Sequence, residues 1–592
     1  MRNLRAESIG FTENWVKNGG IFSETGNRSS QTFRYFGQCG LFLATLSFST
    51  KTNMNKTTAL LSALTLAGGL AVADPGGPTR ADSMKSKAPT NWFNLDPTEG
   101  VRGVSTERAY RELLKNRPSK TVIVGVIDSG IDINHEDLKG KIWVNPKEIP
   151  GNGVDDDKNG YVDDINGWDF LGNKDGRDVK QEQLELTRVY AAYAKRFEGV
   201  DATKLEGKDK EDYEKYQAVK KDFEAKSQEA KATYGIVQQM YKSYVEAERL
   251  VKEALKLDEI KPEDLDKIDL ATADGKLKRA RQILDRGFKM GYNAKELKEG
   301  LDHYQEQAEY NYNLDFNPRE IVGDNPNDVN DRNYGNAEVT GPDARHGTHV
   351  AGIIGAIRNN TLGMSGVADN VKIMAIRAVP DGDERDKDVA NAIRYAVDNG
   401  AQVINMSFGK AYSPQKEWVD EAVRYAQSKG VLLVHAAGNE AENSDEIPAY
   451  PTQTFTDGRR AENWLSVGAL SWKKEPDAVA NFSNYGKSTV DVFAPGVDLF
   501  STVPGSKYED LSGTSMAAPV VTGVAALLMS YFPKLTYQQV KKIILESSIK
   551  LPEMLVTLPG GQDQVPFGTL SATGGVVNAY NAVKMAMEMS KQ

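Results

Sequence analysis

A run of six β-branched and small apolar residues, Val-Ile-Val-Gly-Val-Ile at positions 122–127, constrains the fold of this chain more than any other feature. A continuous apolar run of this length is typical of a strand covered on both faces, as in a parallel sheet. Further strand patterns follow, with helical patterns between them. The predicted strands are 371–379, 402–406, 431–436 and 464–467, and the predicted helices include 388–398, 417–428, 535–547 and 577–587.

The alternation of strands and helices predicts an α/β fold with a doubly wound, mostly parallel central sheet. In such a sheet the crossovers are right-handed, and functional residues collect beyond the carboxyl ends of the strands. The chain has 592 residues, which is more than one average domain. A large α/β domain that carries an insertion accounts for most of this length.

The insertion is predicted between residues 180 and 317, where the sequence becomes charged and helical. Apolar residues there step by three and four positions, which draws a stripe along one helix face. They are Val237, Tyr241, Tyr244, Ala247, Val251 and Leu255. We therefore expect the α/β domain to be formed by 92–179 and 318–592. Two interpretations of the insertion remain open, a solvated spacer that packs on itself and an element with a function.

A signal peptide is predicted over residues 54–73. It has a polar and basic start, an apolar run at 59–70 and a small-residue ending, Ala-Val-Ala. The alternatives are a buried helix and a chance apolar run. A signal peptide predicts export, to a periplasm or out of the cell, with translation from Met54. Residues 1–53 would then not belong to the native product, and residues 74–91, rich in Pro and Gly, are interpreted as a linker.

The composition of the chain limits which partners and which stabilising bonds are expected. No apolar run approaches membrane-spanning length, so no membrane span is expected. The net charge of -10, with acidic residues spread along the chain, argues against a nucleic-acid partner. The only cysteine, Cys39, precedes the predicted signal peptide. An exported product would therefore have no disulfide and would depend on a large core or a bound metal for stability.

Four segments place a reactive side chain where a strand ends or a helix begins. VIDSGID puts Asp128 directly after the first predicted strand, and VHAAGNE puts Asn439 at the end of another. HGTHVAGIIGA places His346 at the start of an apolar helix, and SGTSMAAPVV places Ser515 at the start of a longer one. These are the residue types that nucleophilic hydrolysis of a peptide bond requires.

Each residue type has a separate chemical reason. A serine hydroxyl becomes a useful nucleophile when a neutral imidazole takes its proton, and a carboxylate fixes the imidazole tautomer. Ser515, His346 and Asp128 supply these roles. The Ser515 backbone N–H and the Asn439 side-chain amide are the expected donors to the oxyanion that forms on the attacked carbonyl. Gly438 allows a close approach of backbone or substrate beside them.

The order Asp, His, Ser, in the contexts VIDSGID, HGTHVAG and GTSMAAP, resembles that of the subtilisin-like serine proteases, the subtilases. The resemblance covers about residues 92–170 and 317–585. It implies a serine endopeptidase that cleaves extended polypeptides through an acyl-enzyme. Two alternatives are a catalytically silent binding protein with this fold and a maturation protease dedicated to one substrate. The presence of all three triad residues and the oxyanion amide favours an enzyme.

The resemblance also implies a substrate strand, Ser407-Phe408-Gly409, which would pair with an extended peptide by β-augmentation. Gly438 would line the same groove, and Phe408 suggests an apolar contribution to the pocket for the residue before the scissile bond. The other reading of Ser407 is a sheet residue with no ligand. His349 and His435 lie within apolar motif segments and are expected to be buried and hydrogen-bonded rather than catalytic.

A calcium loop is the prediction from the segment NGVDDDKNGYVDDINGWDF. Its oxygen-bearing residues fall at the first, third, fifth, seventh and ninth places of an EF-hand-like loop. They are Asp155, Asp157, Asn159, Tyr161 through its carbonyl, and Asp163. The twelfth place is Asn166, where a glutamate is usual. The alternative is an acidic, turn-rich surface loop.

Enzymes of this kind commonly carry a folded propeptide, and the stretch from Asp74 to the core is too short for one. Because the insertion lies between Asp128 and His346, we hypothesise that it takes over a gating or folding role.

Overall fold

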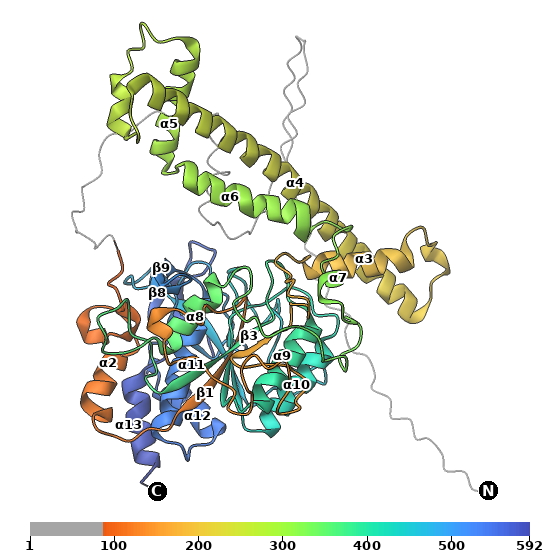
Figure 1. Cartoon of the computed structure of the whole chain (residues 1–592), viewed down its shortest axis with the longest axis vertical. Helices are drawn as coiled ribbons and strands as arrows, with labels where there is room; N and C mark the ends of the chain where they lie inside the picture. The colour runs from red at the N-terminus through yellow and green to blue at the C-terminus, as the bar shows by residue number, and fades with distance from the viewer. Residues whose placement is uncertain (1–86, 592) are drawn as a thin grey trace, which may run out of the picture. The chain divides into compact units, whose positions relative to one another are not determined.

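The computed structural model describes residues 87–591 (Figure 1). The predicted signal peptide at 54–73, the prediction for 1–53 and most of the predicted linker at 74–91 lie outside the described residues. Export therefore stays a prediction.

A nine-stranded sheet forms the centre of the fold, in the order β10-β13-β7-β6-β5-β4-β1-β3-β2. All neighbouring strands in it are parallel except β10 and β13. The five predicted strands are confirmed with small shifts at their ends, as β1 Val122–Asp128, β3 Val371–Arg377, β4 Val403–Met406, β5 Leu432–Ala436 and β6 Trp464–Leu470. The remaining strands of the sheet are short, namely β2 Gly167–Asp169, β7 Val492–Pro495, β10 Ile549–Lys550 and β13 Gly575–Val576.

Helices cover both faces of the sheet, which confirms the doubly wound α/β fold (Figure 1). On one face pack α8 Arg345–Gly355, α11 Thr514–Tyr531, α12 Tyr537–Ser547 and α13 Ala579–Met589. On the other face pack α9 Asp386–Asp398 and α10 Lys416–Ser428. Side chains alternate between the two cores. In β4, Val403 joins the first core and Ile404 the second, because successive strand residues point to opposite faces.

Helix α11 runs through the first core and contacts β4, β5, β6 and β7. Among residues 87–591 it is the one helix long and apolar enough to span a membrane, but 94% of the window concerned is buried in the fold. Its apolar character is that of a core helix. The smaller elements are α2 Thr106–Ala109, α7 Arg319–Val322 and two hairpins, β8 Leu499–Val503 with β9 Lys507–Leu511 and β11 Leu555–Thr557 with β12 Gln564–Pro566.

The insertion is built from α3 Glu185–Phe197, α4 Gly207–Leu255, α5 Gly275–Met290 and α6 Ala294–Glu306. Helix α4 has 49 residues and contacts the other three. At 1.5 Å per residue it is about 74 Å long. The predicted apolar stripe is confirmed. Val237, Tyr244, Ala247 and Val251 are buried, and Tyr241 and Leu255 are partly buried. The predicted helical character of this region is thus confirmed.

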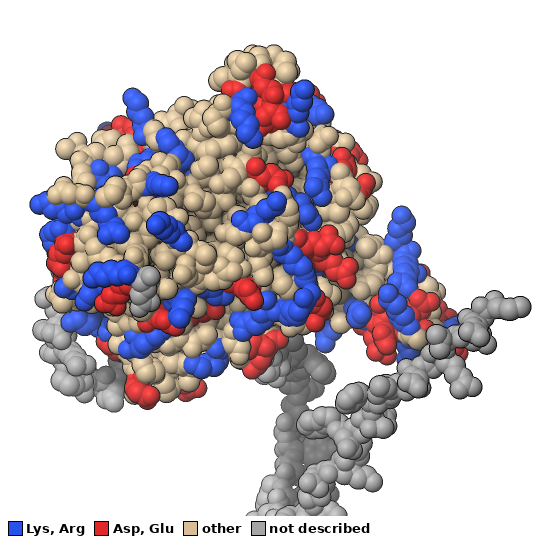
Figure 2. Space-filling model, turned by 90° about the horizontal axis from the view of Figure 1, so that it is seen from below, with Lys and Arg blue, Asp and Glu red and all other residues tan. Residues whose placement is uncertain are grey.

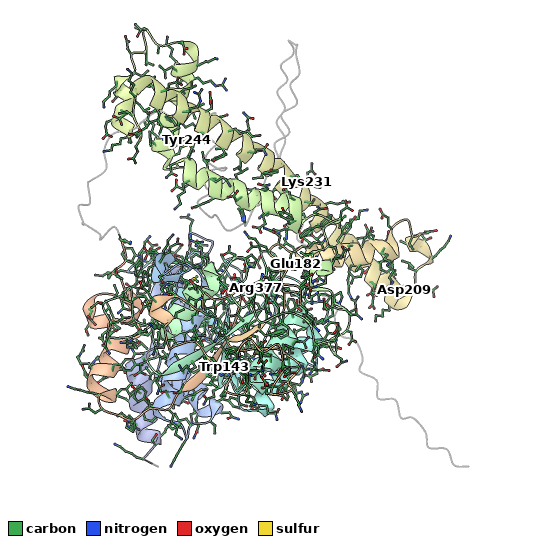
Figure 3. The ribbon with its side chains drawn as sticks, in the orientation of Figure 1. Trp143, Glu182, Asp209, Lys231, Tyr244 and Arg377 are labelled. Carbon is green, nitrogen blue, oxygen red and sulfur yellow. The ribbon has the colours of Figure 1, made fainter. Side chains whose placement is uncertain are left out.

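Two apolar clusters stabilise the insertion. The distal cluster is made within the insertion itself, from α4, α5 and the segments beside them, and includes Tyr244 and Leu284. The proximal cluster joins α3 and the first half of α4, where the Tyr190 and Phe223 rings stack with centroids 4.4 Å apart. Tyr412, from the loop after β4, packs against the proximal cluster. Figure 3 marks Tyr244 in the distal cluster and Glu182 where the chain enters the insertion.

On the face seen in Figure 2, lysine and arginine alternate with aspartate and glutamate over the surface, and neither sign gathers into a single large patch.

Candidate active site

The carboxyl ends of β1, β4 and β5 bring three of the predicted site segments to one edge of the sheet. In the parallel register, Ile127 lies beside Met406, and Met406 beside His435. The residues that follow these strands are therefore neighbours. They are Asp128 at the end of β1, Ser407 after β4 and Asn439 three residues after β5.

Asp128 and His346 form a hydrogen bond of 2.7 Å, in which the ring Nδ1–H donates to Oδ1. Asp128 is 2% exposed, and the same oxygen accepts the Ser129 N–H. Burial lowers the pKa of His346, but the Asp128 carboxylate raises it by more, and the net direction is upward. Helix α8 can approach this closely because residue 347 is glycine. A Cβ there would lie 2.1 Å from the Gly130 carbonyl oxygen and 3.1 Å from the Asp128 side chain.

Ser515 lies in the first turn of α11, which contacts α8. Its hydroxyl donates to the Ser407 carbonyl at 3.0 Å, and the Ser407 hydroxyl donates to the Ser515 carbonyl at 2.9 Å. The Ser515 hydroxyl is therefore bonded to the predicted substrate strand rather than to His346, and the predicted role as nucleophile requires a rotation of its side chain. Catalytic hydrogen bonds are often formed only when substrate binds.

A buried chain of hydrogen bonds fixes the start of α11 against β4. Thr522 of α11 donates to the Asn405 Oδ1 at 2.9 Å, and Asn405 Nδ2 donates to the Ser407 hydroxyl at 2.9 Å. Both Asn405 and Thr522 are fully buried. The position of the Ser515 backbone is thus set by the sheet.

Asn439 is held with its amide N–H groups free. Its Oδ1 accepts the Thr514 N–H at 2.9 Å and the Thr514 hydroxyl at 3.0 Å, while its Nδ2 has no partner among residues 87–591. Glu440 accepts the Asn439 backbone N–H at 2.9 Å and the Asn484 Nδ2 at 2.7 Å. The Asn439 amide and the N–H groups at the start of α11 are therefore available to stabilise an oxyanion.

The predicted substrate strand, 407–409, has an edge whose backbone groups are not paired with another strand. The neighbouring residue Lys410 exchanges backbone hydrogen bonds with Tyr450 at 2.9 and 2.8 Å, but the Gly409 N–H and carbonyl have no backbone partner in the described part of the chain. Phe408 is 9% exposed and packs into the core of α9 and α10, so its side chain lies mostly beneath the groove. Gly438, on the opposite side, has φ +107°, a conformation that favours glycine.

The other motif histidines are buried, as expected. His435 donates to the Phe408 carbonyl at 2.9 Å, and burial lowers its pKa to about 4. His349 bonds the Leu499 carbonyl at 2.9 Å, and burial lowers its pKa to about 3. Both are therefore neutral at pH 7. The bond from His435 fixes the carbonyl of Phe408, a residue of the predicted substrate strand.

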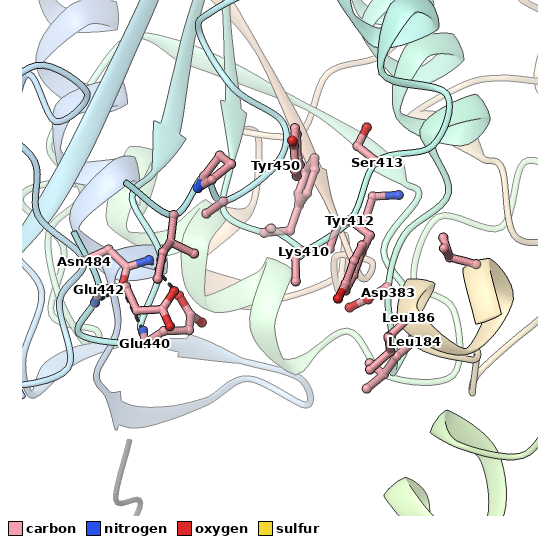
Figure 4. A pocket seen from close by; sticks show the side chains of 18 of the residues that line it. Leu184, Leu186, Asp383, Lys410, Tyr412, Ser413, Glu440, Glu442, Tyr450 and Asn484 are labelled. Atoms are coloured by element: carbon pink, nitrogen blue, oxygen red, sulfur yellow. Dashed lines mark hydrogen bonds between the residues drawn. The ribbon is translucent and has the colours of Figure 1, made fainter. Parts of the chain in front are cut away.

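A cavity of about 950 Å³ begins at Ser515 and Asn439 and continues along the substrate strand to the insertion (Figure 4). Glu440, Glu442 and Asn484 lie at one side of the view, and Tyr412, Leu184 and Leu186 at the other. The insertion therefore contributes directly to the cavity that Ser515, the predicted nucleophile, also lines.

A buried ionic cluster joins the insertion to the substrate strand. Lys410 Nζ lies 2.8 Å from Glu185 of α3 and 2.9 Å from Asp386 of α9, and the three side chains are at most 6% exposed. Arg188 adds a second partner to Glu185 at 2.6 Å. Burial by itself raises the pKa of Glu185, but the positive charges of Arg188 and Lys410 outweigh this effect and lower the pKa to about 2. Glu185 is therefore ionised at pH 7, and the cluster fixes α3 beside Gly409.

Two carboxylates of the predicted metal loop, Asp155 and Asp157, form a group with Glu148, which precedes the loop, and the oxygens of the three lie within 4.8 Å of one another. Glu148 is 7% exposed, and its Oε2 is buried without a partner. An all-oxygen donor set with one such unpartnered atom fits a hard cation such as Ca²⁺. The sequence pattern missed Glu148, which precedes Asp155 by seven residues.

The other predicted ligands are Asp163, Asn159 and the Tyr161 carbonyl, and the structure gives the following contacts for their residues. The Asp163 carboxylate accepts the N–H groups of Gly151 and Gly153 at 2.8 Å each, and lies outside the group of three. Asn159 Oδ1 accepts the Tyr161 N–H, and Asn159 Nδ2 donates to Asp164. Of the predicted carboxylate ligands, Asp155 and Asp157 thus belong to the acidic group and Asp163 does not, while ligation by Asn159 and by the Tyr161 carbonyl stays a prediction.

The model of the subtilase family matches residues 119–575. The chain belongs to this family of peptidases, whose fold and Asp, His, Ser order it shares. It is 46% identical to a thermophilic serine proteinase of Bacillus sp. strain AK1 and 41% identical to thermitase of Thermoactinomyces vulgaris, over 186 residues in each case. These matches cover 31% of this chain, and 42% and 61% of the two relatives.

Subtilisin BL of Lederbergia lenta is 38% identical over 207 residues, which are 35% of this chain and 71% of that one. Among solved structures, a protease of Pseudoalteromonas arctica matches with a TM-score of 0.33 and 30% identity, over 41% of this chain and 70% of that one.

Proposed function

We propose that this protein is an exported serine endopeptidase that cleaves extended polypeptides by an acyl-enzyme mechanism. The observation that carries the proposal is the 2.7 Å bond between Asp128 and His346 at the sheet edge where Ser515 and Asn439 also lie. Membership of the subtilase family supports it. Casein hydrolysis by the purified protein, with covalent labelling of Ser515 by a serine-directed inhibitor, tests it. A folded protein that does neither would favour the silent binding protein.

The proposed reaction uses each residue at a stated atom. His346 Nε2 takes the proton of the Ser515 hydroxyl as Oγ attacks the scissile carbonyl, and Asp128 stabilises the imidazolium that results. The Asn439 amide and the Ser515 backbone N–H donate to the oxyanion. His346 then protonates the leaving amine, and water hydrolyses the acyl-enzyme by the reverse sequence of proton transfers.

Substrate is proposed to bind as an added strand along Ser407–Gly409. The unpaired N–H and carbonyl of Gly409 supply backbone hydrogen bonds that do not depend on side-chain identity. This favours a broad endopeptidase. A protease dedicated to one maturation step is the second candidate, and cleavage of a peptide library at many sequences would exclude it. Export is proposed from the signal pattern at 54–73, and the N-terminus of the mature protein tests it.

Replacement of Asn439 by Leu is expected to lower kcat by about 10²- to 10³-fold with little change in KM. The amide stabilises charge that develops only in the transition state, so its loss leaves substrate binding intact. Steady-state kinetics on a peptide substrate measure the effect. The matched control is Asn443→Leu, four residues further on, whose exposed amide contacts Glu446 and not the triad. Equal losses in both variants would contradict the assignment.

We further propose that Glu148, Asp155 and Asp157 hold a structural calcium ion. The ion would stabilise the folded state by binding to it alone, as befits a chain with no cysteine after Cys39. Chelation is expected to lower the melting temperature by on the order of 5 °C. In Glu148→Gln this calcium-dependent shift should vanish, while Asp163→Asn should keep it. The same shift in all three proteins would count against this site.

A further inference from the structure

The residue that follows the predicted substrate strand joins this strand to the insertion. Lys410 comes directly after Gly409, and its backbone exchanges hydrogen bonds with Tyr450 at 2.9 and 2.8 Å. Its side chain is 2% exposed. Because consecutive Cα atoms are only about 3.8 Å apart, the contacts that fix Lys410 also limit where Gly409 lies.

Three oxygen atoms surround the Lys410 ammonium, which has three N–H groups to donate. They belong to the Glu185 carboxylate at 2.8 Å, the Glu384 carbonyl at 2.7 Å and the Asp386 carboxylate at 2.9 Å. Burial lowers the pKa of Lys410, but Glu185 and Asp386 raise it by more, so the ammonium is charged at pH 7. Glu185 is the partner that the insertion supplies. Without its carboxylate, a buried charge would lose one of its three acceptors.

Glu185 is itself held in a fixed orientation at the start of α3. Its two carboxylate oxygens accept from Arg188, at 3.2 Å from Nε and 2.6 Å from Nη2. Its backbone N–H donates to the Asp383 carboxylate at 2.7 Å, and Arg188 donates to the Asp383 carbonyl at 2.9 Å. The first turn of α3 is therefore bound to the segment that precedes α9, and the Glu185 carboxylate is preorganised for Lys410.

The two ends of the strand 407–409 are held in different ways. At one end, Ser407 exchanges hydrogen bonds with Ser515 of α11. At the other end, the Gly409 N–H and carbonyl have no backbone partner in the described part of the chain, so the position of Gly409 depends on Lys410. An extended polypeptide would pair with Gly409. A small reagent that reacts with Ser515 does not need this pairing.

We propose that Glu185 of the insertion is a positioning residue of the peptidase, which acts through Lys410 to hold Gly409 where an extended polypeptide can pair with it. This inference rests on the proposed function, since it concerns how the same site binds its substrate. It gives the first turn of α3 a role in catalysis, in place of that of a spacer. Loss of the carboxylate would let Gly409 shift, and a misplacement of about 1 Å in a substrate-positioning group can lower a rate by about 100-fold.

The test compares two reactions of the full protein. One is hydrolysis of casein, an unfolded polypeptide, and the other is labelling of Ser515 by phenylmethylsulfonyl fluoride, a small serine-directed inhibitor. Casein kcat/KM is expressed per mole of labelled serine, so misfolded molecules do not count. In Glu185→Ala, the ratio of casein kcat/KM to the rate constant of labelling is expected to fall at least about tenfold. Glu185→Gln keeps the shape of the side chain and an acceptor for Lys410, so its ratio should lie between those of wild type and Glu185→Ala.

The matched control is Arg196→Ala, which removes an ion pair of 2.9 Å to Asp212 inside the insertion, where the Arg196 side chain is 47% exposed. This variant should keep the wild-type ratio. A ratio unchanged in Glu185→Ala, or lowered equally in Arg196→Ala, would overturn the inference while leaving the peptidase assignment intact. A wild type that fails to cleave casein, or fails to react with the inhibitor, would overturn the proposed function itself. A loss of stability alone lowers both reactions together and does not imitate the expected change in their ratio.

Discussion

Replacement of Ser515 by Ala is expected to lower kcat by about a millionfold, the magnitude established for loss of the serine from a subtilisin triad. The residual rate would come from the oxyanion donors and substrate binding, which the substitution leaves in place. Casein or peptide hydrolysis by the two purified proteins measures the loss, and labelling by a serine-directed inhibitor should disappear with it.

The change removes one oxygen at a half-buried position, so the fold is expected to persist. Circular dichroism and the melting temperature check this. The matched control is Ser512→Ala, three residues earlier, whose exposed hydroxyl bonds Asp498 in the neighbouring loop. Activity retained in the Ser515 variant, or lost equally in the Ser512 variant, would remove Ser515 from the role of nucleophile.

Asp128→Asn is expected to lower kcat by about 10⁴-fold at neutral pH, the magnitude known for this change in a serine protease triad of another fold. The amide introduced there can donate to Nδ1, which places the ring proton on the nitrogen that must accept from Ser515. Kinetics between pH 5 and 10 measure the effect. Our assignment of Asp128 would fail if the variant kept more than about a tenth of the wild-type rate.

The same experiment reports the ionisation of His346. The imidazole acts as a base only when neutral, so wild-type activity falls as the pH drops through the His346 pKa. Because Asp128 raises that pKa, the acid limb of kcat/KM should lie above the ordinary histidine value. Removing the carboxylate takes away the upward contribution, so the acid limb of the residual activity should move to lower pH.

The sequence predicted the centre of the sheet well, because its strands are long, apolar and bounded by clear helical patterns. β1 and β3 were found nearly to the residue. The edge strands β2 and β10, and β13 next to β10, have two or three residues each and carry no periodicity of their own, so only the pairing with a neighbour defines them. The predicted apolar stripe covers only the second half of α4. The first half of the helix is largely charged, and its buried face rests on a few aromatic residues such as Tyr216 and Phe223.

For the site, local motifs carried the information. Asp128, His346, Asn439 and Ser515 each stand in a short segment with its own pattern, whereas their supporting residues do not. Asn405 bonds Thr522 and Lys410 bonds Glu185, and both partners are more than 100 residues away in the chain. The local sequence around Asn405 and Lys410 has no pattern that predicts these contacts. Glu148 was missed for a related reason, because the EF-hand spacing directs attention to residues after Asp155 and not before it.

The buried ionic cluster around Lys410 limits how a folded protein could enter the proposed site as a substrate. Swinging α3 away from the substrate strand would separate Lys410 from Glu185 and leave each charge with one partner fewer, so that Lys410 keeps Asp386 and Glu185 keeps Arg188. Losing a buried ion-pair contact costs free energy, so the cluster opposes this opening. The slot beside Gly409 therefore resists widening for its ligand. We therefore expect the rate at which a folded protein is cleaved to depend on how often that protein locally unfolds a segment long enough to enter the slot.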